Sequence, residues 1–259
     1  MKAIITGASS GLGRDMAYVL SEKGYDIIAV ARREDRLLEL KRELKTDVEI
    51  LCIDVCDIEQ CKLLAQKSAE ADVFINNAGF GVFGNFCDTE LDDELKMLDT
   101  NIRAVHVLTK LVTKQFKERG YGHILNVASL AAFFPGPLFA AYYASKSYVL
   151  RLTQAVNEEL RRDKSKVKIS VLCPGPVHTE FAKVAKVNFG TGKEKIGRAV
   201  VLKSHDVAEY AIRKMLSGKL VIVPGIVMRI AVGVRRFLSD KMLAKTVYAI
   251  QNKKMVIKD

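Results

Sequence analysis

Short apolar runs alternate along most of the chain with longer stretches in which apolar residues recur at helical spacing. The runs are apolar throughout instead of alternating with polar residues, which is typical of parallel strands covered by helices on both faces. The pattern predicts strands at residues 2–5, 27–31, 48–53, 73–76, 123–128, 167–172 and 220–223. We therefore expect a single-domain α/β protein with a doubly wound parallel sheet of about seven strands, which binds ligands beyond the carboxyl ends of its strands.

The region after the last expected strand differs in composition. Residues 1–225 hold the alternation of strands and helices, whereas residues 226–259 form a basic extension that we expect to be helical. The net charge of the chain is +11, and the segment from Arg213 to Asp259 holds eleven Lys or Arg residues against two acids. The positive charge is therefore concentrated at the end of the chain.

A helix over residues 226–238 would place Arg229 and Arg236 on one face, with Ile230, Val234 and Phe237 largely away from them. Such a helix can pack across a neighbouring subunit or cover the active site. It can also lie on an anionic membrane surface. We expect packing against protein, with a weak peripheral membrane contact as the alternative.

A glycine-rich turn directly follows the first expected strand and leads into an expected helix over residues 14–23. Glycines permit the unusual dihedrals of such a turn and let a phosphate approach the backbone without meeting a Cβ atom. The helix start adds free N–H groups and the positive end of a dipole. These features predict a dinucleotide phosphate site formed by Thr6, Gly7, Ser9, Ser10, Gly11, Leu12 and Gly13.

Tyr142 and Lys146 stand four residues apart and would share one face of a helix. A cation near a phenol favours the phenolate and lowers its pKa, so this pair predicts a tunable proton donor. Tyr143 is the competing phenol. It lies about 100° away around the helix, where we expect it to pack or to line a substrate pocket.

Several motifs in one order make the chain resemble the short-chain dehydrogenase/reductase family, and the resemblance covers most of the chain. Residues 6–13 are similar to its Thr-Gly-x-x-x-Gly-x-Gly turn, residues 76–79 to its Asn-Asn-Ala-Gly sequence, and residues 174–179 to its Pro-Gly-x-Val-x-Thr segment. Asn101, Ser129, Tyr142 and Lys146 match its catalytic tetrad. The extended basic tail departs from the common pattern, since many relatives finish with Asp-Gly-Gly after the last strand.

The resemblance implies a Rossmann fold and hydride transfer between a nicotinamide cofactor and a carbonyl or alcohol. Tyr142 would then be the proton donor, Lys146 would lower its pKa and hold the nicotinamide ribose, Ser129 would orient the carbonyl, and Asn101 would position a water. Asp54 would meet the adenine amino group. Besides the glycine turn, the implied cofactor contacts are Asp54, Val55, Asn77, Ala78, Gly79, Tyr142, Lys146, Pro174, Gly175, Val177 and Thr179.

The residues after the second expected strand bear on which nucleotide binds. NAD-specific relatives carry an acid there, but this chain has Ala31 followed by Arg32 and Arg33. A guanidinium can bind a 2′-phosphate with paired, charge-assisted hydrogen bonds. We therefore expect NADP(H) to be preferred over NAD(H), with Arg32 as the selecting residue, and carbonyl reduction to be the physiological direction. The alternative is that both arginines simply begin a solvated helix over residues 34–45.

The resemblance implies that two segments set the choice of substrate. Residues 130–141 contain Phe133, Phe134 and Phe139, which predict either an apolar pocket or a lid packed on its own helices. Residues 180–203 are rich in glycine and mixed charge, and we expect a flap that orders on binding.

The cysteines and histidines lack the spacing of metal ligands, so we expect no metal site. Cys52 and Cys173 fall in or beside expected strands and should be buried, reduced thiols. No charged leader precedes the first strand and no apolar run approaches the ~20 residues that span a bilayer, so we expect a cytoplasmic protein.

The partners expected are a small, apolar carbonyl or alcohol substrate and further copies of the chain, as a homodimer or homotetramer, with no nucleic acid. One alternative is a reductase of 3-oxoacyl thioesters carried on an acidic protein. Another is a nucleotide-sensing interaction protein, which the intact tetrad disfavours.

Overall fold

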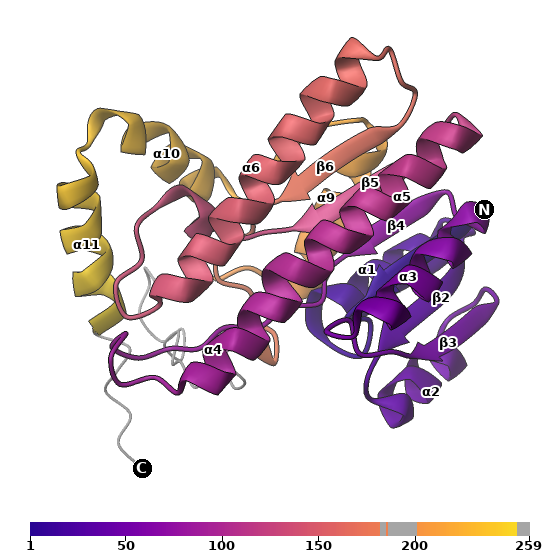
Figure 1. The fold of residues 1–259 in the computed structure, drawn as a ribbon, viewed down its shortest axis with the longest axis horizontal. Helices are drawn as coiled ribbons and strands as arrows, with labels where there is room; N and C mark the ends of the chain where they lie inside the picture. The colour runs from indigo at the N-terminus through magenta and orange to yellow at the C-terminus, as the bar shows by residue number, and fades with distance from the viewer. Residues whose placement is uncertain (182–184, 186–200, 253–259) are drawn as a thin grey trace.

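A seven-stranded parallel sheet forms the centre of the protein in a computed structural model, which describes residues 1–181, 185 and 201–252 (Figure 1). The strand order is β3-β2-β1-β4-β5-β6-β7, and every neighbouring pair is parallel. This confirms the expected fold class. The strands are β1 (Lys2–Thr6), β2 (Asp26–Ala31), β3 (Val48–Cys52), β4 (Val73–Asn76), β5 (His123–Val127), β6 (Lys168–Leu172) and β7 (Val221–Ile222).

Helices cover both faces of the sheet. One face carries α1 (Gly11–Glu22), α2 (Glu34–Glu43) and α9 (Ser204–Leu216). The other carries α3 (Ile58–Lys67), α5 (Val105–Arg119) and α6 (Ala140–Arg162) (Figure 1). The strand order reverses between β1 and β4, and in such sheets the crevice at this switch point is the usual ligand site.

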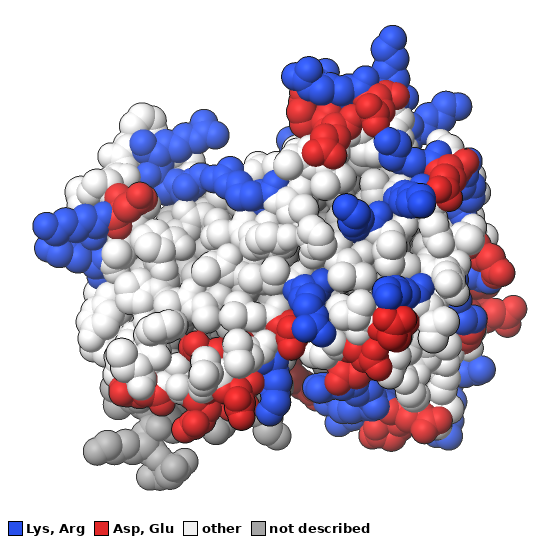
Figure 2. Space-filling model, in the orientation of Figure 1, with Lys and Arg blue, Asp and Glu red and all other residues white. Residues whose placement is uncertain are grey.

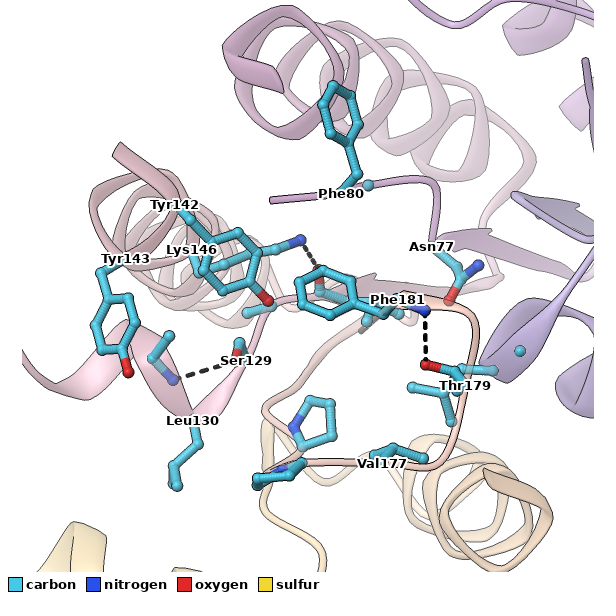
Figure 3. A pocket seen from close by; sticks show the side chains of 18 of the residues that line it. Asn77, Phe80, Ser129, Leu130, Tyr142, Tyr143, Lys146, Val177, Thr179 and Phe181 are labelled. Atoms are coloured by element: carbon cyan, nitrogen blue, oxygen red, sulfur yellow. Dashed lines mark hydrogen bonds between the residues drawn. The ribbon is translucent and has the colours of Figure 1, made fainter. Parts of the chain in front are cut away.

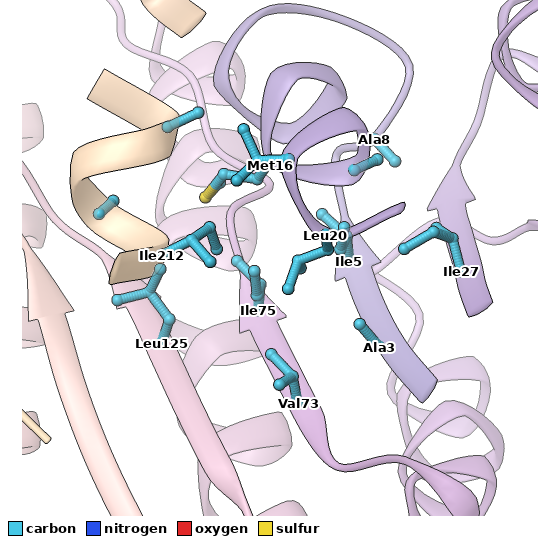
Figure 4. Close-up of a cluster of buried hydrophobic side chains, with 14 of the residues drawn as sticks. Ala3, Ile5, Ala8, Met16, Leu20, Ile27, Val73, Ile75, Leu125 and Ile212 are labelled. Atoms are coloured by element: carbon cyan, nitrogen blue, oxygen red, sulfur yellow. The ribbon is translucent and has the colours of Figure 1, made fainter. Parts of the chain in front are cut away.

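Consecutive strand residues pack into two separate hydrophobic cores, because side chains along a strand alternate between the two faces of the sheet. Ile5 packs with Met16 and Leu20 of α1 and Ile212 of α9, whereas Ile4 belongs to the cluster on the α5 side. Figure 4 shows the first cluster, with strand side chains meeting the two helices. Burial on both faces explains why the strand sequences are apolar throughout.

A buried hydrogen-bond network ties the centre of the sheet to two helices. Asn76 Nδ2 donates to Asn126 Oδ1 at 2.9 Å, and Asn126 Nδ2 donates to Thr153 Oγ1 of α6 at 3.0 Å. Thr109 of α5 also donates to Asn126 Oδ1, at 3.2 Å. The network fixes β4 and β5 relative to α5 and α6, from which the site residues project.

The sequence of residues 90–117 predicts one long helix, which the structure divides by a wider turn. It consists of α4 (Leu91–Leu98), a π-helical stretch at Asp99–Ala104, and α5. Gly120 ends α5 in the left-handed conformation, with φ of +92°. The π-helical stretch contains Asn101, and such stretches occur frequently at functional sites.

After β7 the chain forms α10 (Ile226–Val234), a 3₁₀ turn at Arg235–Phe237 and α11 (Asp240–Asn252), which pack beside the amino-terminal end of α6 (Figure 1). The single helix expected over residues 226–238 therefore ends at Val234. Within the part of the chain that is described, no helix has the length and apolarity needed to cross a bilayer.

One prediction about the cysteines is wrong. Cys173 is buried, but Cys52 is exposed, because it is the last residue of the edge strand β3. Burial inferred from a strand pattern fails at a sheet edge, where one side has no neighbouring strand.

Candidate active site

One large pocket of about 1140 Å³ lies beyond the carboxyl ends of the strands. It begins at the glycine turn after β1, passes the residues that follow β2 to β6, and ends against α10 and α11. Figure 3 shows its centre, where Asn77 and Thr179 lie on one side and Tyr142 and Tyr143 on the other. The pocket is therefore continuous from the glycine turn to Tyr142 and Tyr143.

The glycine turn has no room for side chains. Gly7 and Gly11 have φ of +68° and +53°, which favour glycine. A Cβ added to Gly13 would lie 2.3 Å from the carbonyl oxygen of Gly7, and one added to Gly11 would lie 3.0 Å from Thr179. The turn thus brings bare backbone to the mouth of the pocket, above the start of α1.

Thr6 and Asn77 fasten the glycine turn to the loop after β4. Thr6 Oγ1 accepts hydrogen bonds from the backbone N–H groups of Asn77 and Ala78 at 3.0 and 3.1 Å. Asn77 Nδ2 in turn donates to the carbonyl oxygens of Thr6 and Gly7 at 3.0 and 3.2 Å. Thr6 therefore acts behind the pocket wall and does not line the pocket.

Arg33 closes the far side of the glycine turn. Its guanidinium donates to the hydroxyls of Ser9 and Ser10 at 3.1 and 2.8 Å and to the Glu180 carboxylate at 3.0 Å. The Arg33 hydrogen bond lowers the pKa of the Glu180 carboxyl. Beside the glycine turn, the Arg33 guanidinium and the two serine hydroxyls thus already form a site occupied by one anion, the Glu180 carboxylate.

Arg32 is placed differently. Its side chain is 73% exposed and stands 3.8 Å from the Asp54 carboxylate, at the pocket edge. Asp54 Oδ1 also accepts a hydrogen bond from the backbone N–H of Cys56 at 3.0 Å. Of the two arginines, Arg33 is the one in contact with the glycine turn.

Tyr142 lies on α6 and is buried, with its hydroxyl directed toward that of Ser129 (Figure 3). Burial raises the pKa of the Tyr142 phenol, and the Ser129 hydrogen bond opposes this effect. The sequence led us to expect a pKa lowered by Lys146, so the direction is opposite. The reason is that desolvation of the phenol outweighs the influence of any neighbour.

Lys146 is 4% exposed, and its Nζ donates to the Val127 carbonyl oxygen at 3.1 Å. Burial lowers the pKa of the Lys146 amine to about 8. Its Nζ lies 5.8 Å from the centroid of the Tyr142 ring, so the two side chains share one face of α6 as expected. A buried amine with a pKa this close to neutrality can exchange a proton under ordinary conditions.

Asn101 is fully buried behind the pocket wall. Its Nδ2 donates to the Phe80 carbonyl oxygen at 2.9 Å and to Ser145 Oγ at 3.1 Å, and its Oδ1 accepts from the Phe80 N–H at 3.2 Å. Asn101 therefore joins the π-helical stretch to the loop after β4 and to α6. A Cβ added to Gly79 of that loop would lie 2.8 Å from Asn101 Oδ1 and 3.1 Å from Lys146 Nζ.

Ser129 is held by its own backbone surroundings. It precedes a 3₁₀ turn at Leu130–Phe133, and its hydroxyl oxygen accepts a hydrogen bond from the Ala131 N–H at 3.1 Å. The hydroxyl hydrogen remains free to point into the pocket, toward Tyr142. The hydrogen bond that caps the 3₁₀ turn thus also fixes the direction of the Ser129 side chain.

Aromatic side chains enclose Tyr142. The Phe139 ring stacks on it with centroids 4.5 Å apart, and the Phe181 ring lies 5.4 Å away. Of the three phenylalanines in the loop before α6, Phe134 and Phe139 line the pocket, whereas Phe133 packs under the guanidinium of Arg235. The segment expected to form a flap, residues 180–203, lies largely outside the described residues.

The pocket brings together every proposed site residue except Thr6, Gly13 and Asn101, which act behind its wall. From the sequence, covering of the active site by a helix over residues 226–238 was one alternative beside packing on another subunit, and the contribution of α11 to this wall was not foreseen. Helical periodicity identifies an apolar face, but it does not say which surface that face meets. The members of this wall are Met228, Ala231, Val234, Arg235, Leu238, Leu243, Thr246, Val247, Ile250 and Gln251.

The residues present fit a nicotinamide dinucleotide. The bare glycine turn suits a pyrophosphate, Arg33 with Ser9 and Ser10 suits a further phosphate, and the pocket runs unbroken from there to Tyr142 and Lys146.

Comparison with known proteins agrees with this arrangement. The family model of the short chain dehydrogenases matches residues 1–188. An uncharacterized oxidoreductase of Staphylococcus epidermidis is 32% identical over 197 residues, which is 74% of this chain and 84% of the relative. An uncharacterized oxidoreductase of Staphylococcus aureus is 30% identical over 232 residues, covering 88% of this chain and 96% of the relative.

Solved structures show the same likeness. A short-chain dehydrogenase from Sphingobium yanoikuyae in complex with NADPH superposes with a TM-score of 0.79 at 26% identity, covering 91% of this chain and 93% of the other. A short chain dehydrogenase/reductase from Burkholderia phymatum in complex with NAD gives a TM-score of 0.80 at 25% identity, with coverage of 91% and 92%.

The chain belongs to the short-chain dehydrogenase/reductase family. It is therefore an oxidoreductase of the NAD(P)-dependent class, with a Rossmann-type fold in a single domain.

Proposed function

We propose that the protein reduces a carbonyl compound to an alcohol with NADPH and that Tyr142 donates the proton. The observation that carries this proposal is the buried Tyr142 hydroxyl facing that of Ser129, in a pocket continuous with the glycine turn. Reduction places negative charge on the carbonyl oxygen, which requires a proton donor and a hydrogen-bond donor at that oxygen. The two hydroxyls supply both.

Each residue of the proposed tetrad has one task. The bound nicotinamide supplies the hydride. Ser129 hydrogen-bonds the carbonyl oxygen and fixes its direction, while Tyr142 gives up its proton to the same oxygen. Lys146 contributes an ammonium that stabilises the phenolate left behind, and Asn101 holds the loop and helix that position Lys146. Phe139, stacked on the phenol, keeps Tyr142 oriented.

The test of the reaction is Tyr142→Phe. We expect kcat for carbonyl reduction to fall about a hundredfold or more, because general acid catalysis contributes about 10²–10⁴-fold. NADPH affinity, measured by fluorescence titration, should stay close to the wild-type value. Tyr210→Phe on α9, which lies outside the pocket, is the matched control and should keep full activity. If Tyr142→Phe kept half of the wild-type kcat, Tyr142 would not be the proton donor.

We further propose that the 2′-phosphate of NADPH binds at Arg33, Ser9 and Ser10, with Arg32 in a supporting role. The contacts of Arg33 with both serine hydroxyls support this assignment, because they form an anion site at the adenosine end of the pocket. From the sequence, Arg32 was the expected selector of the nucleotide, but its side chain is largely exposed.

Arg33→Ala should lower the ratio of kcat/KM for NADPH over NADH by about tenfold or more, since hydrogen bonds to charged groups are worth about 1.5–3 kcal/mol. Arg32→Asp should lower the same ratio less. The exposed Arg42→Ala on α2 is the control. A larger effect at Arg32 than at Arg33 would reverse the assignment.

A further inference from the structure

A polar pair stands in the apolar wall at the substrate end of the pocket. Gln251 of α11 donates from Nε2 to the Tyr143 hydroxyl oxygen of α6 at 2.7 Å. Both residues line the pocket, and Gln251 is only 4% exposed. Figure 3 places Tyr143 on the side of Tyr142 away from Asn77 and Thr179, so this pair belongs to the substrate part of the pocket and not to the nucleotide part.

The groups that the pair leaves unused include the Tyr143 hydroxyl donor and the Gln251 amide acceptor. Because the Tyr143 oxygen accepts from Gln251, its hydroxyl hydrogen remains available to donate. Gln251 Oε1 is buried and has no hydrogen-bond partner in the described chain. A buried amide oxygen without a partner costs about 1–3 kcal/mol, so a ligand that supplies a hydrogen bond there would be favoured.

The surroundings keep both side chains in place. The Tyr143 ring lies directly against Gly136, where an added Cβ would come within 2.0 Å of it. Burial raises the pKa of the Tyr143 phenol, so its proton is retained at neutral pH. The remaining wall formed by α10 and α11 is mainly apolar, with Met228, Leu243 and Val247 among its members.

A donor beside an acceptor is complementary to a hydroxyl group, which accepts from one and donates to the other. A carboxylate has no proton for Gln251 Oε1, and an ammonium has no lone pair for the Tyr143 hydroxyl. Arg235, also in this wall, directs one guanidinium N–H to the Phe133 carbonyl oxygen at 3.1 Å. The pair therefore discriminates between neutral and ionised substrates.

We propose that the substrate is a bulky apolar carbonyl compound that carries a hydroxyl group away from the reacting carbonyl, and that Tyr143 and Gln251 bind this hydroxyl. The inference rests on the proposed carbonyl reduction, since it assumes that the carbonyl lies at Tyr142 and Ser129. It adds a specificity site built by two segments that lie 108 residues apart in the sequence.

The test uses a matched set of ketones. The first is 4-cyclohexylcyclohexanone, and the second and third carry a hydroxyl or a carboxylate at the far ring carbon. We expect wild-type kcat/KM with NADPH to be at least tenfold higher for the hydroxylated ketone than for the plain one. Tyr143→Phe and Gln251→Leu should each reduce this ratio severalfold or more. Tyr248→Phe, on α11 and outside the pocket, should leave it unchanged.

Binding of the same ketones, measured by calorimetry in the presence of NADP⁺, separates the two proposals. Tighter binding of the hydroxylated ketone without turnover would refute the carbonyl reductase and leave the hydroxyl site standing. Turnover of both neutral ketones at equal rates and affinities would overturn the hydroxyl site alone. Preference for the ketone with the carboxylate would also overturn it and would indicate that Arg235 binds the substrate. Circular dichroism confirms that each variant is folded.

Discussion

Lys146, to which we assign a role in the proposed reaction, is buried at a cost in folding free energy. An ammonium that is almost fully removed from water is destabilised, and among the described residues the only hydrogen bond of the Lys146 amine is to the Val127 carbonyl oxygen. The pKa of a lysine is about 10.4 in an unfolded chain, whereas burial lowers that of Lys146 to about 8. The folded protein thus holds this proton less tightly than the unfolded chain does.

Lys146→Met should therefore make the protein more stable while abolishing carbonyl reduction. Below about pH 8 both states of the wild type are protonated, and the lowered pKa corresponds to roughly 3 kcal/mol of lost stability. This loss shrinks as the pH rises from 8 to about 10.4, where the unfolded chain also gives up its proton. Urea unfolding at pH 7 and pH 10 measures the effect.

The expected gain in unfolding free energy is up to about 3 kcal/mol at pH 7 and less than about 1 kcal/mol at pH 10. The exposed Lys41→Met on α2 should change stability little at either pH. A variant that is less stable than the wild type at pH 7 would mean that the Val127 hydrogen bond outweighs the desolvation of the amine.

Single residues were predicted well where a motif fixes both residue type and backbone position. The glycine turn, Ser129, Tyr142 and Lys146 lie around one pocket, as their order in the sequence led us to expect. Which of Arg32 and Arg33 contacts the glycine turn could not be predicted in this way. Adjacent residues at a strand end point in different directions, and the direction depends on partners such as Ser9 and Ser10.

Among the elements, the π-helical stretch between α4 and α5 has the clearest link to the site. It presents Asn101 to both backbone groups of Phe80, and so it holds the loop that carries Asn77 and Gly79. Sequence periodicity predicted a helix through this region. It could not predict the widened turn, because one extra residue in a turn shifts the apolar pattern too little to detect.

Asn101→Leu should keep the side-chain volume but leave two Phe80 backbone groups without partners. We expect a loss of about 2 kcal/mol in unfolding free energy, together with weaker NADPH binding and a lower kcat. Asn157→Leu, on the outer part of α6, makes the same chemical change away from the site and should affect none of these. Unchanged stability and kcat in Asn101→Leu would show that the loop keeps its position without this residue.

At the scale of the whole molecule, charge is unevenly distributed. Figure 2 shows a broad uncharged area over the amino-terminal halves of α5 and α6, with acidic and basic residues gathered around it. Leu91 and Leu95 of α4 and Tyr148 of α6 are exposed, and the Tyr148 hydroxyl is 2.6 Å from His106 Nδ1 of α5. A stable dimer interface needs about 800 Å² from each partner, and we propose that copies of the chain associate through the helices that carry Asn101 and Tyr142.

Sedimentation velocity should show the wild type as a dimer or tetramer. Leu95→Glu combined with Tyr148→Glu should convert it to a monomer of 28.8 kDa, because the two carboxylates would be buried at the interface without partners. Leu38→Glu, an exposed position on α2 across the sheet, should leave the assembly intact. A monomeric wild type at micromolar concentration would remove this surface from consideration.

The arrangement of the sheet was predictable from the whole sequence, because seven apolar runs with intervening helices admit few topologies. The contact between α11 and α6 was not. It joins Tyr143 to Gln251 through tertiary packing that leaves no periodic signal in the sequence. The basic composition of residues 226–259 indicated only that they could meet another subunit, the active site or a membrane surface.

The Arg33–Glu180 ion pair has a consequence for how the nucleotide is selected. If the 2′-phosphate binds at Arg33, it has to displace a carboxylate that the protein itself supplies. Exposed ion pairs are worth up to about 1 kcal/mol, so Glu180→Gln should tighten NADPH binding by at most about fivefold and leave NADH binding almost unchanged in fluorescence titrations. Equal affinities in variant and wild type would mean that Glu180 leaves Arg33 at no cost. If Glu180→Gln does tighten NADPH binding, nucleotide choice is a competition between two anions for one guanidinium, in which the Glu180 carboxylate sets the affinity that the 2′-phosphate must exceed.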